Sequence, residues 1–440
     1  MDGQFRLGGS FKCSCGRTHE VPVRSFYYQK DAIEKAPDIL ATSLGGQPLG
    51  KSVVVADERT FRICGQRVAA RLSCKSLIVP DGPGKGPVCD DSTCLWLKQQ
   101  LSRTTPQLVV AVGSGTINDL CKWAAFEMKL PYAVVATAAS MNGYAAANVA
   151  AKVRGVKVIL RAAPPLAVLA EPAVIEHAPA EMTAAGFADT LAKFFSKADW
   201  IMNSFLFDEH YCGYCADILN DIQSFYLDNP EKLRTADGAT IKALFEALFL
   251  TGIAMTMVGT SAPASGGEHL LSHVLDMTAD IDNQRHSLHG LQVGLGTIVS
   301  AALYEQILAI DEPVIHKLPR DIDAPYWRND SLIDSVSEQY AAKQDSAQTA
   351  AGKIAQPKTF TQLKNKLRPV VKTPSAVKDL LRRAGAAAGI KDLGLSRQRA
   401  TEALLHMHEI RRRFTVVDLA WLTGVLPGAI GEVIDTNLSQ

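Results

Sequence analysis

Short apolar runs that alternate with helical patterns over the first 170 residues restrict the possible fold more than any other feature. Four runs are long enough for buried strands, namely Ser52–Asp57, Ser76–Pro80, Gln107–Val112 and Ala133–Thr137. Between the last two runs, apolar residues recur at helical spacing from Thr116 to Lys129. Strands that alternate with helices predict a parallel sheet with right-handed crossovers.

The character of the chain changes near Pro172, after which long helical patterns dominate. These patterns span Ala180–Ala198, Glu209–Tyr226, Gly238–Val258, Gly267–Met277 and His289–Ile310. The more polar stretch Pro313–Ser375 is expected to form a peripheral insertion or mobile helices, and the tail Ser396–Thr423 returns to a helical pattern. We therefore predict two domains, residues 1–171 and 172–440, with a loop at Gly82–Pro87.

Composition excludes several classes of protein. The 46 basic and 45 acidic residues leave a formal net charge of +1, so neither a nucleic-acid partner nor a membrane surface is indicated. The start of the chain, Met1–Arg6, lacks the pattern of a signal peptide. The uncharged stretch Ala133–Ala151 is too rich in small and polar residues for a membrane span. Nine cysteines without an export signal predict reduced thiols in a cytoplasmic protein.

A glycine turn, Gly113-Ser114-Gly115-Thr116, follows one predicted strand and opens a helix. Glycines let a backbone approach a phosphate, and a helix N-terminus presents N–H groups to it. A plain strand-to-helix turn explains the residues equally well. Asp57, at the end of an earlier strand, is a candidate for the ribose hydroxyls of a dinucleotide. Its alternative role is a helix cap, which is the commoner use of such a residue.

A carboxylate and several histidines form a candidate metal site. Asp189 stands on an otherwise apolar helical stretch, and buried carboxylates are rare unless they are paired or bound to metal. His269 and His273 are four residues apart and therefore share one helix face, while His289 opens a later helix. One carboxylate and two imidazoles suit a catalytic divalent ion. Hydrogen-bonded structural histidines are the alternative.

Three other motifs have weaker explanations. Cys13, Cys15 and His19 offer three zinc ligands without a clear fourth. The pair Cys212 and Cys215 has the spacing of a redox motif, but it lies in a helical region, which favours two reduced thiols. The run Arg411–Arg413 is expected to be a solvated face.

Taken together, these motifs resemble the glycerol-1-phosphate dehydrogenases, in particular the AraM-type branch of the iron-containing alcohol dehydrogenase and dehydroquinate synthase superfamily. The segments that carry the resemblance are Gly113–Lys122, Ala185–Lys193, Asp199–Trp200, Pro263–His273 and His289–Gly294. The likeness covers most of the chain and is weakest between about 313 and 375. It implies a Rossmann-like N-terminal domain and a helical C-terminal domain, with the active site in the cleft between them.

The resemblance also implies roles for individual residues. Asp189, His269 and His289 would be the metal ligands and catalytic groups together with Lys193, and the metal would be zinc, nickel or iron. NAD(H) or NADP(H) would bind Asp57, Gly113, Ser114, Gly115, Thr116, Asp119, Thr137 and Ser140. Substrate would meet Asn142 and His273, with Lys193, Lys152 or Arg154 as further cations for a phosphate. A homodimer is expected by analogy.

One position departs from the family pattern. Relatives carry Ser-x-Asp-Gly where this chain has Ser140-Met141-Asn142-Gly143, so an amide replaces a charged carboxylate in the substrate region. The implied reaction is reduction of dihydroxyacetone phosphate to sn-glycerol-1-phosphate. Three alternatives stay open: a dehydrogenase for another small polyol or phosphorylated carbonyl, a lyase or cyclase similar to dehydroquinate synthase, and a non-catalytic ligand-binding relative. Asp189 and Lys122 favour the dehydrogenase over the lyase.

Overall fold

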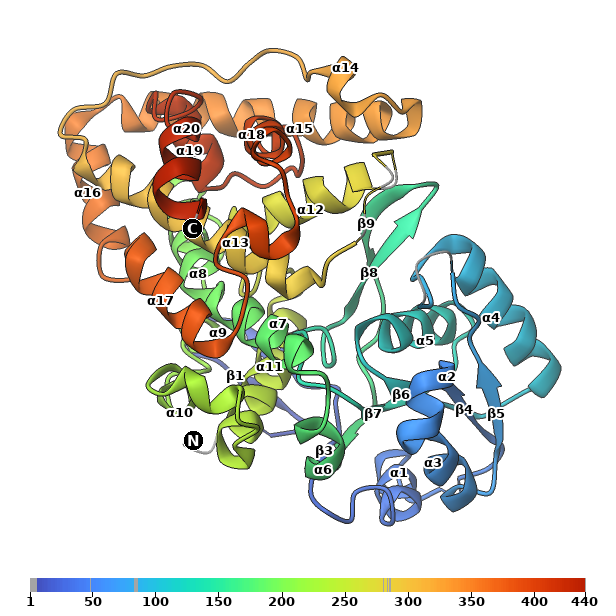
Figure 1. Ribbon diagram of the computed structural model, residues 1–440. Coiled ribbons are helices and arrows are strands. Elements are labelled where there is room, and N and C mark those ends of the chain that lie inside the picture. The colour runs from blue at the N-terminus through green and yellow to red at the C-terminus, as the bar shows by residue number, and fades with distance from the viewer. Residues whose placement is uncertain are drawn as a thin grey trace. The chain divides into compact units, whose positions relative to one another are not determined.

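The computed structural model describes residues 6–47, 49–82, 86–279, 281, 282, 284 and 286–439 (Figure 1). Residues 1–5 and residues 83–85 of the predicted loop at 82–87 lie outside these residues. The chain forms two compact units, one of residues 1–186 and 213–260, the other of residues 187–212 and 261–440. The division at 171/172 and the cleft implied by the resemblance stay predictions.

A six-stranded parallel sheet is the centre of the first unit. Its strands lie in the order β3 (Ser25–Tyr28), β10 (Ala167–Ala170), β7 (Tyr132–Ala136), β6 (Leu108–Gly113), β4 (Ser52–Ala56) and β5 (Lys75–Ile78). Each neighbouring pair runs in parallel, which confirms the predicted sheet. The four predicted strands are β4, β5, β6 and β7, and the edge strand β3 and its neighbour β10 were not foreseen.

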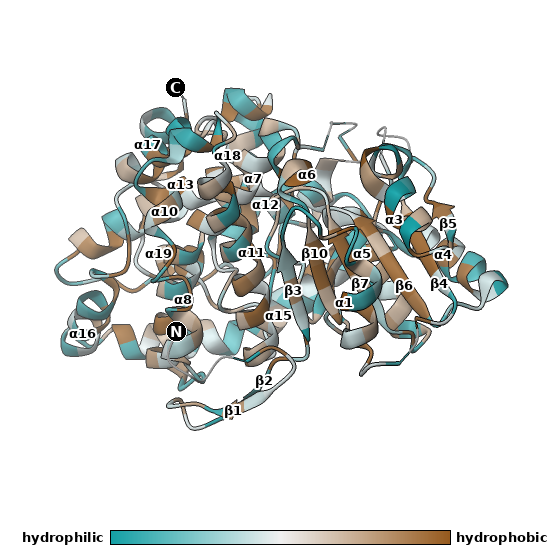
Figure 2. Cartoon of the chain, turned by 90° about the horizontal axis from the view of Figure 1, so that it is seen from below, coloured by the Kyte–Doolittle hydropathy of each residue, from teal (hydrophilic) through white to brown (hydrophobic). Residues whose placement is uncertain are grey.

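The central strands are buried on both faces, which explains why they read as continuous apolar runs (Figure 2). Alternate residues such as Val54 and Val110 contribute to a core shared with α1 (Ala36–Ser43) and α3 (Gln66–Arg71). Helix α5 (Gly115–Glu127) packs on β6 and β7, and α4 (Asp91–Thr104) packs on α5. The sheet therefore holds the carboxyl end of β6 and the following glycine turn in a rigid frame.

The remaining elements of the first unit are two antiparallel hairpins, several short helices and one long helix. They are β1 (Ser10–Lys12), β2 (Thr18–Glu20), α2 (Glu58–Thr60), η1 (Phe61–Gly65), β8 (Asn148–Val153), β9 (Val156–Arg161), α6 (Pro172–Glu176), α9 (Gly213–Ala216), α10 (Ser224–Leu227), η2 (Pro230–Leu233) and α11 (Gly238–Val258). Helix α7 (Ala180–Leu191) contains the boundary between the units.

The second unit is entirely helical over the residues described. Its elements are α8 (Lys193–Phe207), α12 (Glu268–Ala279), α13 (His289–Ala309), α14 (Ala324–Trp327), α15 (Asp330–Ile354), α16 (Pro357–Leu367), α17 (Pro374–Ala384), η3 (Ile390–Leu393), α18 (Arg397–His406), α19 (Val416–Leu422), α20 (Ile430–Glu432) and η4 (Val433–Leu438). Helix α13 is central, because it packs against α8, α12, α17 and α19. The polar stretch 313–375 contributes the long helix α15 rather than only peripheral segments.

Some predicted helices have different limits. Gly238–Val258 is correct, because Asp237 caps its start and Gly259, with φ +78°, ends it. The predicted helix at 180–198 is two helices separated at Ala192, and the tail pattern 396–423 is interrupted between α18 and α19. The prediction of one helix over 209–226 was wrong: between α9 and α10 the chain makes successive turns, such as that closed by Asn220 N–H and Asp217 O at 2.9 Å.

Helices α11 and α13 are long and apolar enough to cross a membrane by length and composition. Core helices of soluble proteins meet the same criterion, and 78% of each apolar window is buried inside the structure. Their uniform hydrophobicity therefore fits helices that are packed inside the protein.

We predict that Gly296→Ala destabilises the second unit and disturbs α12 and α13 together. A Cβ atom at Gly296 would lie 2.0 Å from the carbonyl oxygen of Glu268, so the two helices would have to separate. Overpacking of this kind costs about 1–3 kcal/mol or more, measurable as a lower urea midpoint. The control is Gly352→Ala in α15, where nothing lies within 4 Å; it should be neutral or stabilising. Equal midpoints for the two variants would refute the prediction.

Candidate active site

Asp189, His269 and His289 converge within the second unit. They come from α7, from the first turn of α12 and from the first residue of α13. One ligand atom from each side chain lies within 4.8 Å of the others, and Asp189 Oδ1 is 3.6 Å from His269 Nε2. Asp189 and His269 are buried, and the two imidazole centroids are 5.3 Å apart. The structure thus brings together the three residues that the sequence proposed as ligands.

The orientation of His269 is fixed by its neighbour in sequence. His269 Nδ1 lies 2.9 Å from Glu268 Oε1. A carboxylate can only accept, so Nδ1 carries a proton, and Nε2 is the nitrogen that faces Asp189. Burial lowers the pKa of His269, but hydrogen bonds and charges from Asp189 and Glu268 outweigh it and raise the pKa above its ordinary value. A divalent cation would relieve the resulting excess of negative charge around the imidazole.

His289 is oriented by a chain of two hydrogen bonds. The hydroxyl of Ser272 donates to Gln292 Oε1 at 2.8 Å. The Ser272 hydroxyl oxygen lies 2.9 Å from His289 Nδ1, and because its only proton is already donated to Gln292, it accepts from the imidazole. Nδ1 of His289 therefore carries a proton, and Nε2 is the nitrogen left to face a metal ion. Outer hydrogen bonds that fix the tautomer in this way are typical of metal-binding histidines.

A loop before α12 is held by a buried carboxylate that the sequence did not single out for this purpose. Asp199 accepts hydrogen bonds from Gly267 N–H at 2.7 Å and from the Tyr304 hydroxyl at 2.5 Å. Burial, and then the charge of Glu268, raises the pKa of Asp199 to about 7. These bonds connect α8 and α13 to the start of α12, and so they position His269.

The prediction that Arg411–Arg413 forms a solvated face was wrong for two of the three residues. Arg411 donates to the carbonyl of Gly266 at 3.3 Å and Arg413 donates to that of Ser265 at 3.3 Å. Burial, and then repulsion from Arg413, lowers the pKa of Arg411 to about 10. Only Arg412 is exposed. A run of like charges could not reveal these contacts, because they are made to residues about 150 positions earlier in the chain.

His273 lies on α12 with His269, and Lys193 begins α8, the helix that follows the one carrying Asp189. The His273 ring is 6.2 Å from the rings of both His269 and His289, and it is half-buried. Lys193 is the first residue of α8 and is buried. Neither belongs to the ligand set, so a substrate-contacting role for each stays a prediction.

In the first unit, the glycine turn has the geometry of a close strand-to-helix connection. A Cβ atom at Gly113 would lie 2.7 Å from Cβ of Ile117, which explains the glycine. Ser114 is the N-cap of α5, and its carbonyl accepts the first helical bond, from Asn118 N–H at 2.9 Å. The N–H groups of Gly115, Thr116 and Ile117 precede that bond and are oriented for an anion.

Asp57 is a helix cap in the structure. Its Oδ1 accepts from the backbone N–H groups of Arg59 at 2.7 Å and Thr60 at 3.0 Å. Arg59 in turn forms a bidentate ion pair with Asp81. The structure therefore contains the helix cap that the sequence favoured. A second role, binding the ribose of a cofactor, is compatible with the cap because Asp57 directly follows strand β4.

Asp119 and Lys122 fasten the loop that follows β7. Lys122 Nζ donates to the carbonyls of Gly143 at 2.6 Å and Asn148 at 3.0 Å and lies 3.4 Å from Asp119 Oδ1. Burial raises the pKa of Asp119 and lowers that of Lys122, against their mutual attraction. These contacts support the loop, so a direct cofactor contact by Asp119 stays a prediction.

The same loop lies beside the glycine turn. Thr137 N–H donates to the carbonyl of Gly113 at 3.2 Å, and a Cβ atom at Gly115 would lie 3.6 Å from Cγ of Met141. Ser140 and Asn142 flank Met141 and are half-buried. The glycine turn and the loop at 137–142 therefore lie together at the N-terminus of α5, while the second unit offers one carboxylate and two imidazoles, a donor set that suits a divalent ion.

Comparison with known proteins gives consistent relatives. Residues 27–179 match the family described as iron-containing alcohol dehydrogenase. The chain is 38% identical over 262 residues to the glycerol-1-phosphate dehydrogenase (NAD(P)+) of Thermococcus kodakarensis, covering 58% of this chain and 71% of that protein. It is 28% identical over 424 residues to the enzyme of the same name from Bacillus licheniformis, covering 96% of this chain and 94% of that protein.

Solved structures share the fold. The sulfoacetaldehyde reductase of Bifidobacterium kashiwanohense, determined in complex with NAD+, superposes with a TM-score of 0.60 at 17% identity. The match covers 95% of this chain and 99% of that one. The likeness in fold therefore extends over both compact units.

Proposed function

The chain belongs to the glycerol-1-phosphate dehydrogenase family, and from this premise we propose that it is a metal- and NAD(P)-dependent alcohol dehydrogenase that reduces dihydroxyacetone phosphate to sn-glycerol-1-phosphate. The observation that carries the proposal is the convergence of Asp189, His269 and His289, with Nδ1 of each imidazole held by an outer hydrogen-bond partner. We also expect a cytoplasmic homodimer, by analogy with the family.

Asp189, His269 and His289 would hold the metal, and zinc, nickel and iron all suit this donor set. The metal supplies a Lewis acid that polarises a carbonyl or alcohol oxygen. Glu268 and Ser272 engage Nδ1 of the two imidazoles, so Nε2 of each ring would be the nitrogen that coordinates the ion. Asp199 and Arg411 keep the start of α12 in place through Gly266 and Gly267.

The N-terminus of α5 would hold the pyrophosphate of the cofactor, whose nicotinamide supplies the hydride. Gly113 allows α5 to start directly behind β6, and the loop at Ser140–Gly143 lies next to it. Lys122 stabilises that loop by donating hydrogen bonds to the carbonyls of Gly143 and Asn148, so it acts as a positioning residue. Asn142, in the same loop, would influence which ketone the enzyme prefers.

A substrate panel tests the proposal. Oxidation of NADH and NADPH is followed with dihydroxyacetone phosphate, dihydroxyacetone and unrelated aldehydes, in protein loaded with zinc, nickel or iron. We expect dihydroxyacetone phosphate to be the best substrate, and the product to be a glycerol phosphate that an sn-glycerol-3-phosphate oxidase rejects. A better rate with another carbonyl would leave a dehydrogenase with a different substrate. Cyclisation without net NADH consumption would indicate a lyase similar to dehydroquinate synthase.

Asp57 is predicted to favour NADH over NADPH, because its charge repels a 2′-phosphate and its oxygens suit a ribose diol. Asp57→Ser should shift the ratio of kcat/KM values toward NADPH. Serine is also a good N-cap, so this variant should keep the cap of α2 and its thermal stability. Asp57→Ala is the control that loses both functions. Equal or better use of NADPH by the unaltered protein would show that Asp57 does not face the ribose.

Asn142→Asp is predicted to change the ratio of activities on phosphorylated and unphosphorylated ketones. The substitution adds a negative charge in the substrate region, where relatives carry an aspartate, and a charge there interacts with a phosphate dianion. The KM for the cofactor should stay about the same. An unchanged ratio of the two activities would show that Asn142 does not contribute to substrate choice.

A further inference from the structure

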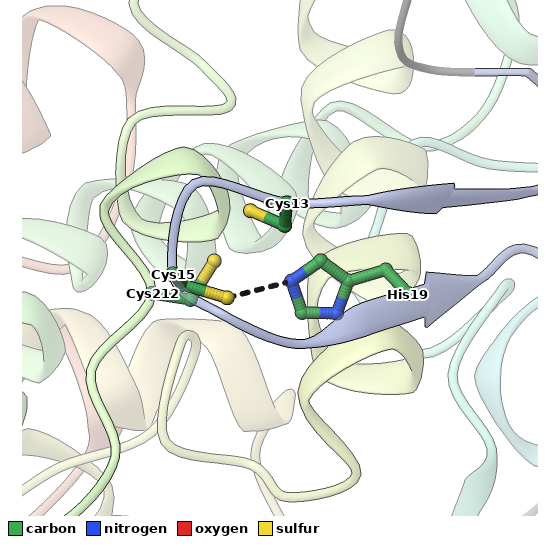
Figure 3. Close-up of side chains that lie close together, drawn as sticks. All are labelled: Cys13, Cys15, His19 and Cys212. Atoms are coloured by element: carbon green, nitrogen blue, oxygen red, sulfur yellow. Dashed lines mark hydrogen bonds between the residues drawn. The ribbon is translucent and has the colours of Figure 1, made fainter.

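Three thiols and one imidazole converge at Cys13, Cys15, His19 and Cys212 (Figure 3). One ligand atom from each residue lies within 4.8 Å of the others, and Cys15 Sγ is 3.4 Å from His19 Nε2. Cys13, His19 and Cys212 are buried, and Cys15 is half-buried. The fourth candidate ligand, which the sequence motif lacked, is thus supplied by a residue almost two hundred positions away.

A β-hairpin positions three of the four residues. Strands β1 and β2 pair with Lys12 opposite Thr18, so Cys13 and Cys15 lie in the connecting turn. Gly16 N–H donates to the carbonyl of Cys13 at 3.0 Å, and Cys13 N–H donates to that of Arg17 at 2.9 Å. Gly16 has φ +86°, a left-handed conformation that other residues rarely adopt. The turn therefore brings both thiols to the same end of the hairpin.

His19 presents one particular nitrogen to the sulfur atoms. Its Nδ1 lies 3.0 Å from the carbonyl oxygen of Met257 in α11. A carbonyl oxygen can only accept, so Nδ1 carries the proton and Nε2 carries the lone pair that faces Cys15. A histidine that donates its other ring N–H to a backbone carbonyl is the usual arrangement at metal sites.

Cys212 is held near the hairpin by contacts of the residues that follow Cys212 in the chain. Cys212 is bonded to Gly213, the residue at which the chain returns to the first unit and begins α9. Two residues along, the ring of Tyr214 contacts the ring of Phe11 edge-on at 5.3 Å. Phe11 pairs with His19 across the hairpin, and their rings are 5.6 Å apart. Contacts within the first unit thus hold the start of α9 against the hairpin.

We propose that Cys13, Cys15, His19 and Cys212 bind one Zn²⁺ as a closed structural site. Three thiolates and one imidazole are an established tetrahedral donor set for zinc, with bonds of about 2.3 Å to sulfur and about 2.0 Å to nitrogen. At those bond lengths, tetrahedral ligand atoms lie about 3.5–3.8 Å apart, close to the observed separation of Cys15 Sγ and His19 Nε2. Four protein ligands leave no position for substrate, so the zinc would connect the hairpin to α9.

This zinc site is independent of the proposed reaction, because its ligands share no residue with the cluster at Asp189. The two sites also differ in chemistry. The cluster at Asp189 has oxygen and nitrogen donors only, whereas the hairpin site is mainly sulfur and favours soft or borderline ions such as zinc. Sulfur coordination therefore identifies the hairpin site in the intact protein, whatever metal the other cluster holds and whether or not the enzyme is active.

The test is cobalt substitution combined with metal analysis of the full chain. Purified protein should contain about one zinc per chain that resists dialysis against EDTA. Protein refolded with Co²⁺ in place of zinc should show a sulfur-to-cobalt charge-transfer band and the intense visible bands of tetrahedral cobalt. Absence of the charge-transfer band, or a disulfide between two of the four cysteines in protein purified under reducing conditions, would overturn the proposal.

Matched cysteine variants assign the ligands. Cys13→Ser and Cys212→Ser should each lose the tightly bound zinc and the charge-transfer band, and should unfold at lower temperature. Cys215→Ser, three residues after Cys212 and equally buried, should keep all three properties. Loss of the band in Cys215→Ser, or its retention in Cys212→Ser, would contradict the ligand set. If a variant does not fold, the wild-type cobalt spectrum still decides the proposal.

Discussion

Replacing His289 with alanine is expected to lower kcat/KM for the ketone by about a thousandfold or more, because a Lewis acid contributes several kcal/mol to such a reaction. The variant should also lose the metal bound at Asp189 and His269, which metal analysis will show. Folding should be retained, since His289 is only half-buried at the first position of α13. The same loss is expected for His269→Ala and Asp189→Ala.

A nearby histidine and an outer hydrogen-bond partner serve as controls. His286→Ala, three residues earlier, should keep its activity, because His286 lies outside the ligand set and faces Asp276 at 3.7 Å. Ser272→Ala removes the acceptor for His289 Nδ1 together with the donor to Gln292 Oε1, and should weaken metal binding by about 10–100-fold. Full activity in His289→Ala with normal metal content would show that this residue is not a ligand.

Lys122→Met is expected to destabilise the first unit by about 3–5 kcal/mol, which is the usual cost of breaking a buried ion pair. Lys122 is fully buried, and its loss would leave Asp119 without its cation and remove the hydrogen bonds from Nζ to the carbonyls of Gly143 and Asn148. The free energy of unfolding, measured in urea, should fall accordingly. The loop at 140–148 should also become more susceptible to proteolysis.

Two further variants test whether the loss of stability comes from breaking the buried ion pair between Lys122 and Asp119. Lys98→Met breaks the more exposed pair with Glu127 and should cost at most about 1 kcal/mol. Lys122→Met combined with Asp119→Asn removes both charges and should recover part of the lost stability. If Lys122→Met and Lys98→Met unfold at the same urea concentration, Lys122 does not fasten the loop.

The sequence was sufficient for the sheet and for the main helices of the site. Strands β4, β6 and β7 are buried on both faces, so their apolar runs are continuous and easily recognised. Asp189, His269 and His289 could be proposed from residue type, spacing and family resemblance, and the structure places them together. Their role as metal ligands stays a prediction.

What the sequence could not provide depends on contacts between distant segments. Arg411 appeared to belong to a solvated run, although it binds the carbonyl of Gly266. Cys212 was expected, with Cys215, to be one of two reduced thiols in a helical region, although it lies beside Cys13, Cys15 and His19. Lys122 looked like part of a cofactor motif, and its contacts with the loop could not be inferred from helical spacing. In each case the partner is fixed by tertiary packing, which local patterns do not encode.

The central claim is most directly tested by the rate of NADH oxidation with dihydroxyacetone phosphate before and after metal is returned to chelated protein. We predict a rate near background after chelation, and recovery when zinc, nickel or iron is added to the wild type but not to His289→Ala. A full rate in the chelated protein would contradict metal dependence, and a metal-restored enzyme that ignores dihydroxyacetone phosphate would contradict the substrate.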